Sequence, residues 1–80
     1  MHEMHLLKDL MDDLLKNAEK NRINKITRVK IRLGEFTEIN KDILIFFLKE
    51  KSKGTPAEGM AIDIEDSPAR ELRLVSFSGE

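Results

Sequence analysis

The period of the apolar residues changes several times along this chain, and those changes restrict the folds it can adopt. Between Met4 and about Ala18 the apolar residues recur at helical spacing. From residue 27 to residue 33 they alternate with polar residues, as in a strand that is buried on one face. A chain that switches between these two periods is expected to build its core from helices packed on a sheet.

Two helices are predicted. The first has an apolar stripe made up of Met4, Leu7, Leu10, Met11, Leu14, Leu15 and Ala18. The second begins near Asn40, a good N-cap residue, and ends before Gly54 and Pro56. Ile45 makes this second helix apolar nearly all round, so we expect more than one of its faces to be covered. Phe46 and Phe47 are therefore core candidates, well ahead of any ligand role.

Three strands are predicted. The first turns Val29, Ile31 and Leu33 inward and ends at Gly34, the second turns Met60, Ile62 and Ile64 inward, and the third spans residues 71–78 around Leu72 and Leu74. Phe77 is out of phase with those two leucines, which indicates either a bulge or burial on both faces. The helix between the first two strands allows them to be parallel neighbours. The short link at Ser67-Pro68 favours antiparallel pairing of the last two strands.

The order of elements is thus α-β-α-β-β. We expect an α/β (α+β) two-layer sandwich in which a three-stranded mixed sheet carries two helices on one face. At 80 residues the chain has room for one core, so residues 1–80 are expected to form a single domain.

Composition excludes several classes of function. The net charge is −1 and the four phenylalanines are the only aromatic residues, so we expect no nucleic-acid partner. No apolar run approaches the roughly 20 residues that span a bilayer, and no signal peptide is evident, so we expect a cytoplasmic protein without a membrane partner. There is no cysteine, which removes disulfides, thiolate zinc sites and cysteine nucleophiles.

The remaining polar residues give little support to catalysis, and we expect no enzyme activity. Asp9, Asp12 and Asp13 are best interpreted as a solvated helix face rather than as an acid/base pair. Arg28, Lys30 and Arg32 form a basic stripe on the outer face of the first strand. This stripe is either an ordinary solvated surface or a docking surface for an acidic partner.

The amino terminus offers an unusual set of nitrogen ligands if Met1 carries the free amino group. The amine and the His2 amide nitrogen close one chelate ring, and that amide with the His2 imidazole closes the next. The Glu3 amide is a candidate for the fourth position. Adjacent nitrogens of this kind suit a square-planar ion, Ni(II) or Cu(II), whereas zinc prefers a tetrahedral set. The ligands must be free of protons, so the affinity should fall steeply as the pH drops through the histidine range.

His5, the second of the two histidines, is ambiguous. At helical spacing it lies near Asp9 and Asp12, which favours an exposed imidazole paired with a carboxylate. The other interpretation makes it an axial or fourth nitrogen ligand of the metal.

Several stretches resemble the HypA-type nickel metallochaperones, the hydrogenase maturation and nickel insertion factors. The opening Met1-His2-Glu3 before an apolar helix is similar to the start of that family. RVKIRLGEFTEI (28–39), KGTPAEGMAIDIEDSP (53–68) and ELRLVSF (71–77) resemble its first strand and turn, its helix end and second strand, and its last strand. The matching stretches follow the family's order over nearly the whole chain.

The resemblance implies a domain that binds Ni(II) and delivers it with a HypB-type GTPase to the large subunit of [NiFe] hydrogenase. In some organisms the recipient is urease, through its accessory proteins. It places the nickel ligands on the Met1 amine, the His2 imidazole and amide, and the Glu3 amide. Glu3 could also contact the GTPase through its carboxylate. His5 is not part of the family's motif.

One departure from the family is large. Members carry a zinc domain with two CxxC pairs between their second and last strands, where this chain has only residues 67–70 and no cysteine. No zinc cofactor is therefore expected. The chain is either a natural relative without the zinc lobe or one from which the lobe was removed and the strands rejoined. Two alternatives stay open: a protein-interaction module that uses the basic stripe or a strand edge without delivering metal, and a dimer that exchanges its terminal strand.

Overall fold

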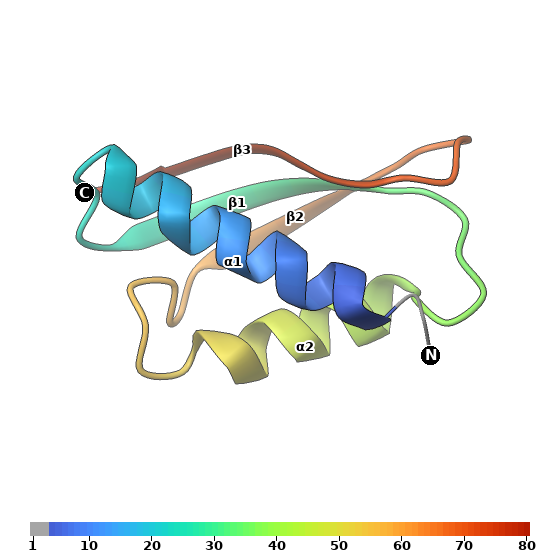
Figure 1. Ribbon diagram of the computed structural model, residues 1–80, viewed down its shortest axis with the longest axis horizontal. Coiled ribbons are helices and arrows are strands. Elements are labelled where there is room, and N and C mark those ends of the chain that lie inside the picture. Colours follow the sequence, from blue (N-terminus) through green and yellow to red (C-terminus); the bar gives the residue numbers. More distant parts are fainter. Residues whose placement is uncertain (1–3) are drawn as a thin grey trace.

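The structure, a computed structural model, describes residues 4–80 and contains two helices and three strands. The elements are α1 (Met4–Lys20), β1 (Ile26–Leu33), α2 (Lys41–Ser52), β2 (Ala61–Asp66) and β3 (Leu72–Gly79). Figure 1 shows two layers, with both helices on the same side of the three strands. The predicted order α-β-α-β-β and the two-layer α+β architecture are confirmed.

The first helix buries the stripe that the sequence predicts. Leu7, Leu10, Met11, Leu14 and Ala18 are buried, whereas Met4 remains 38% exposed at the helix start. The helix continues two residues beyond Ala18 and ends at Lys20. Arg22 then adopts a left-handed conformation with φ of 58°, and the Ile23 N–H donates to the Ala18 carbonyl at 2.9 Å. These contacts turn the chain from α1 into β1.

β1 lies in the centre of the sheet, whose strand order is β2-β1-β3. It pairs in parallel with β2, with Val29 opposite Ile62, and antiparallel with β3, with Leu33 opposite Leu72. The predicted mixed sheet is confirmed. The expected pairing of the last two strands with each other is wrong, because β1 lies between them.

The link between β2 and β3 therefore crosses over the end of β1 (Figure 1). The Ser67 N–H donates to the Leu33 carbonyl at 3.0 Å, and the Gly34 N–H donates to the Glu71 carbonyl at 2.7 Å. A β-carbon on Gly34 would lie 1.6 Å from the carbonyl oxygen of Ala69. The crossing thus depends on a glycine at the position that ends β1.

A bulge in β3 explains the phase of Phe77. Lys30 lies opposite Ser76 and Ile31 lies opposite Leu74, so Val75 has no counterpart on β1. The extra residue returns Phe77 to the helix side of the sheet, where it packs against the core. Of the two explanations that the sequence allows, the structure shows the bulge.

The second helix is capped as predicted, but it buries fewer faces. The Asn40 side chain accepts from the Ile43 N–H at 2.8 Å, and Gly54 follows the helix with φ of 78°. Leu44 and Leu48 are fully buried, and Phe47 is partly buried against the core. Phe46 is 67% exposed, so its assignment to the core is wrong. In a two-layer fold α2 is covered by the sheet and α1, and its outer side stays open.

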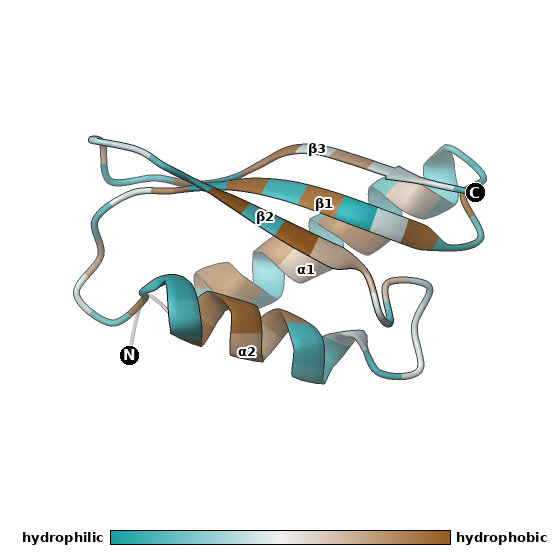
Figure 2. Cartoon of the chain, turned by 180° about the vertical axis from the view of Figure 1, so that it is seen from behind, coloured by the Kyte–Doolittle hydropathy of each residue, from teal (hydrophilic) through white to brown (hydrophobic). Residues whose placement is uncertain are grey.

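The buried residues form one cluster between the layers. In Figure 2, apolar stretches alternate with hydrophilic ones along β1 and β2, as expected for strands with one buried face. Within residues 4–80, neither helix is long and apolar enough to cross a membrane.

Candidate functional site

The predicted nickel ligands Met1, His2 and Glu3 lie outside the described residues. What the structure does describe is the end of the molecule to which they are joined. α1 begins at Met4 and α2 at Lys41, and both helix starts lie at the same end as the link between β2 and β3 (Figure 1). The helix starts, the carboxyl end of β1 and the strand crossing therefore share one end of the fold.

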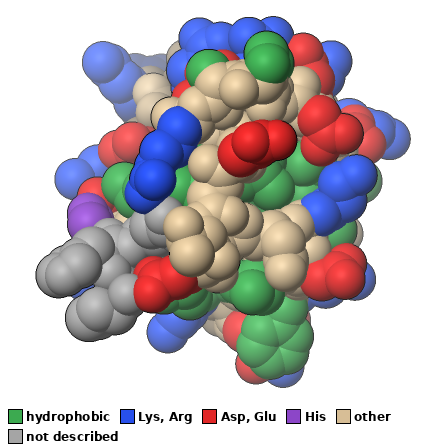
Figure 3. All heavy atoms as spheres, turned by 90° about the vertical axis from the view of Figure 1, so that its right-hand side faces the viewer, with side chains coloured by type: hydrophobic (Ala, Val, Ile, Leu, Met, Phe, Trp, Pro, Cys, Tyr) green, Lys and Arg blue, Asp and Glu red, His purple; other side chains and the backbone are tan. Residues whose placement is uncertain are grey.

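Figure 3 views the molecule from this end. Acidic and basic side chains surround the face, and hydrophobic side chains reach the surface on its lower side, where α2 lies. Ile43 and Phe46 are the exposed large apolar residues of α2. This end of the molecule thus combines mixed charge with a small apolar area.

His5 is exposed in the first turn of α1, as the sequence predicts. Asp9 and Asp12 are also exposed. Between His5 and either carboxylate, the described part of the chain shows no hydrogen bond or ion pair, so the predicted pairing is not formed. The side chain of His5 is exposed, and its role toward a metal stays a prediction.

The described residues offer no second metal centre. Over residues 4–80, no group of three or more His, Cys, Asp or Glu side chains is arranged to hold a metal ion. The whole chain also lacks cysteine, so its residues do not fit the thiolate site that the family's zinc domain implies. That no zinc is bound stays a prediction.

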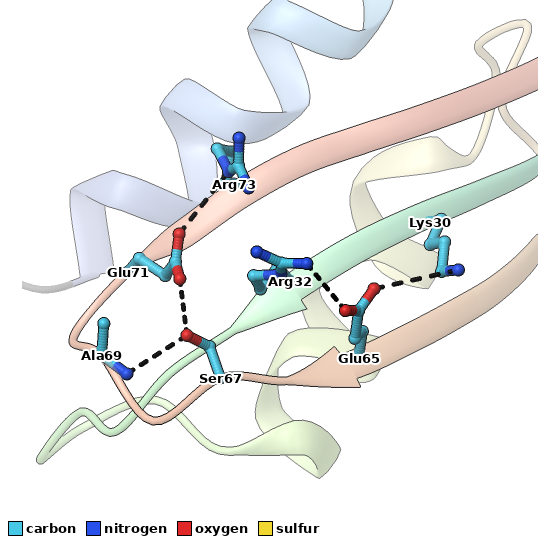
Figure 4. A network of polar contacts seen from close by, with 7 residues as sticks. All are labelled: Lys30, Arg32, Glu65, Ser67, Ala69, Glu71 and Arg73. Atoms are coloured by element: carbon cyan, nitrogen blue, oxygen red, sulfur yellow. Dashed lines mark hydrogen bonds and ion pairs between the residues drawn. The ribbon is translucent and has the colours of Figure 1, made fainter.

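The basic stripe of β1 is paired within the chain. On the outer face of the sheet Arg28 binds Asp63, Lys30 lies 3.8 Å from Glu65, and Arg32 donates to Glu65 at 2.8 Å. Figure 4 shows Lys30 and Arg32 converging on Glu65 from the neighbouring strand. The hydrogen bond from Arg32, and then its charge, hold the pKa of Glu65 below the ordinary value of 4.5.

This pairing favours the interpretation of the stripe as an ordinary solvated surface. Each exposed ion pair contributes little to stability, but together the acidic residues of β2 offset most of the charge on β1. The stripe is better described as one half of a cross-strand ion-pair ladder than as an open surface for an acidic partner. Sequence reasoning missed this ladder because the strand pairing was unknown.

A second polar network holds the strand crossing. Ser67 Oγ donates to the Glu71 carboxylate, the Ala69 N–H donates to Ser67 Oγ at 3.2 Å, and Arg73 Nε lies 3.5 Å from Glu71 Oε1 (Figure 4). The Ser67 hydroxyl is thus both donor and acceptor, and its two hydrogen bonds stabilise a tight turn between β2 and β3. The resemblance to the HypA-type family predicts a further domain in relatives at this position.

Two solved structures have the same fold as this chain. The solution structure of the Ni metallochaperone HypA from Helicobacter pylori matches with a TM-score of 0.76 at 17% identity and covers 94% of each chain. A second structure, described as the solution structure of HypA protein, also has a TM-score of 0.76, at 19% identity, and the match covers 100% of this chain and 97% of that one. At these identities the likeness shows the fold alone, that of the HypA-type structures.

The sequence comparisons identify the family. The HypA model, described as hydrogenase/urease nickel incorporation, metallochaperone, matches residues 1–72. The hydrogenase maturation factor HypA of Lawsonia intracellularis is 40% identical over 68 residues, which are 85% of this chain and 58% of that protein. The one of Methanopyrus kandleri is 35% identical over 65 residues, which are 81% of this chain and 46% of that protein.

The chain belongs to the HypA family, which confirms the resemblance predicted from the sequence. It spans about half the length of these curated relatives.

Proposed function

We propose that this chain is a nickel metallochaperone that binds Ni(II) at its amino-terminal end and supplies it during hydrogenase maturation. The observation that carries the proposal is the extent of the family match, which begins at residue 1 and therefore includes Met1, His2 and Glu3. Ni(II) is here the cargo of the protein rather than a resident cofactor, and the chain acts as a carrier without catalysing a reaction.

The proposed ligands are the Met1 amine, the imidazole and amide of His2, and the amide of Glu3. Two chelate rings that share the His2 amide nitrogen favour a square-planar arrangement, which suits Ni(II). The composition of residues 4–80 supports a terminal site, because no alternative cluster of metal-binding side chains competes for the ion. The described part of α1 begins directly after these residues, at Met4.

Loading and release follow from proton competition. Two deprotonated amides offset the charge of the dication, so the site avoids repulsion by the positive end of the α1 dipole. The same nitrogens bind protons once the pH falls, and a recipient that supplies its own ligands then competes easily. This combination suits transfer of the ion better than permanent storage.

Delivery requires partners. We propose a HypB-type GTPase, contacted through the Glu3 carboxylate, and the hydrogenase large subunit as recipient, with urease accessory proteins as recipients in organisms that make urease. The proposal places this function in the cytoplasm. It concerns a chain about half as long as its curated relatives, so the contacts that their additional length makes are not assigned to it.

The proposal is tested by titrating Ni(II) into protein that begins at Met1, with absorbance as the readout. We expect a d–d band of a square-planar complex near neutral pH, and we expect His2→Ala to abolish it. His5→Ala is the matched control, since it also removes one imidazole but from an exposed helix position. A band that survives His2→Ala at unchanged affinity would remove the terminal chelate. A lower affinity in His5→Ala would add the second imidazole to the ligand set.

A protein-interaction module without metal delivery is the second candidate. The ladder of ion pairs on the outer sheet face argues against an acidic partner at Arg28, Lys30 and Arg32. Failure of the nickel titration together with retained folding would favour this candidate over the metallochaperone.

A further inference from the structure

β3 lies at one edge of the sheet, and the backbone hydrogen bonds at its start show which of its N–H and C=O groups face that edge. The Glu71 carbonyl points toward β1, because it accepts the Gly34 N–H at 2.7 Å. In an antiparallel pair the backbone groups of successive residues point alternately to the two sides. The N–H and C=O groups of Leu72 and Leu74 therefore point away from β1, to the edge of the sheet, where β3 has no neighbouring strand among residues 4–80.

A groove runs beside this edge, between β3 and α1. It has a volume of about 350 Å³. Leu72 and Leu74 of β3 and Leu6 and Leu10 of α1 supply its apolar lining, and Asp9 and Asp13 of α1 supply carboxylates. The side chains of an added strand that lie opposite Leu72 and Leu74 would enter this groove, since paired residues project to the same face of a sheet.

The charges of the groove specify which side chains fit. Asp9 and Asp13 are exposed, and no cation among residues 4–80 forms an ion pair with either of them. Arg73 is also among the lining residues, but its side chain lies on the outer face of the sheet, with Nε 3.5 Å from the Glu71 carboxylate. Lysine and arginine have apolar stems and cationic ends, so they match an apolar floor with carboxylates beyond it.

We propose that the β3 edge binds an extended segment of a partner protein as an additional strand, with lysine or arginine at the two positions opposite Leu72 and Leu74. The backbone groups of Leu72 and Leu74 supply the pairing, and Asp9 and Asp13 select the basic side chains. The residue between the two basic ones lies on the outer face beside Arg73, where glutamate fits.

The bulge sets the length of this interaction. Val75 interrupts the regular ladder immediately after Leu74, and a bulge at an edge hinders the pairing of a further strand. The added strand is therefore confined to the first half of β3, where the groove lies. The proposal uses none of the residues proposed as nickel ligands, so the two proposals succeed or fail independently.

The test uses a short synthetic peptide in which lysine and glutamate alternate, added to the isotopically labelled protein without nickel. We expect the amide protons of Leu72 and Leu74 to become protected from hydrogen exchange, and backbone signals of β3 and of α1 near Asp9 to shift. The double variant Asp9→Asn with Asp13→Asn should bind the peptide about tenfold more weakly, as expected for the loss of two exposed charge pairs.

Asp12→Asn is the matched control. Asp12 is also exposed on α1 but does not line this groove. The Asp12→Asn variant should therefore bind the peptide as tightly as the wild type does. The proposal is overturned if the peptide leaves Leu72 and Leu74 unprotected, or if Asp12→Asn weakens binding as much as the double variant. Protection that appears without peptide and grows with protein concentration would instead show that two copies pair through their β3 edges, and it too would overturn the proposal.

Discussion

Replacing Gly34 by alanine should destabilise the fold through the strand crossing. The new β-carbon would lie 1.6 Å from the Ala69 carbonyl oxygen and 2.7 Å from the Glu71 nitrogen, and both atoms belong to the backbone. A side-chain rotation cannot relieve either of these close contacts, so the link over the end of β1 must move away. That movement breaks the hydrogen bond from Gly34 to Glu71 and weakens the one from Ser67 to Leu33.

The cost can be approximated from these contacts. Overpacking that shifts backbone costs about 1–3 kcal/mol, and each hydrogen bond contributes about 1 kcal/mol. We expect the free energy of unfolding to fall by about 3 kcal/mol. For a domain of this size that lowers the melting temperature by roughly 12–24 °C. Urea and thermal unfolding followed by circular dichroism measure both quantities.

Gly59→Ala is the control. Gly59 has φ of 81°, and a β-carbon there would meet no atom within 4 Å. Its substitution carries only the conformational cost of a left-handed residue, about 1–2 kcal/mol. If Gly34→Ala is no more destabilising than Gly59→Ala, the close crossing over β1 is refuted.

Three further predictions concern the core, the ion-pair ladder and the metal. Phe46→Ser should change the free energy of unfolding by less than about 0.5 kcal/mol, because the side chain is 67% exposed, whereas Leu44→Ala should cost about 2–5 kcal/mol in the same urea titration. Arg32 holds the pKa of Glu65 below 4.5, so the stability that the charged carboxylate contributes is present above that pH and is lost as the pH falls through the lowered value. Glu65→Gln should remove this part of the acid sensitivity in unfolding curves between neutral and acid pH, and an unchanged pH profile would contradict the role of Arg32. Nickel affinity should fall steeply as the pH is lowered through the histidine range, and an affinity independent of pH would exclude the imidazole and amides as ligands.

The sequence predicted the elements of this fold because their signals are local. The helical stripe from Met4 to Ala18, the alternation that ends at Leu33 and the cap at Asn40 each depend on residues a few positions apart. The phase of Phe77 relative to the leucines before it indicates either a bulge or burial on both faces, and the structure shows the bulge. Such patterns determine which face of an element is buried.

The same patterns do not determine which elements are neighbours. The short link favours pairing of β2 with β3, whereas in the structure the link crosses the end of β1 and passes close to Gly34. The pairing of Arg28 with Asp63 follows from the parallel register, which the sequence did not reveal. The apolar residues around the second helix predict that Phe46 is in the core, but they do not reveal how many layers cover that helix. Phe46 is 67% exposed because only one side of the helix is covered.

The candidate nickel site was derived from a different kind of reasoning. It rests on the ligand chemistry of Met1, His2 and Glu3 and on the resemblance to the HypA family. The family comparison confirms that the chain belongs to this family. The structure contributes the surroundings: a helix that starts at Met4 and a described chain without a competing metal cluster. The ligand set itself stays a prediction.

The measurement that tests this claim most directly compares two proteins that have identical side chains. One begins at Met1 with a free amine, and in the other the Met1 amine is acetylated, which removes it as a ligand while leaving both histidines in place. Ni(II) is titrated into each near neutral pH and followed by absorbance. We predict a square-planar d–d band in the first protein and its loss in the second. The same band at the same affinity in both proteins would contradict the terminal nickel site.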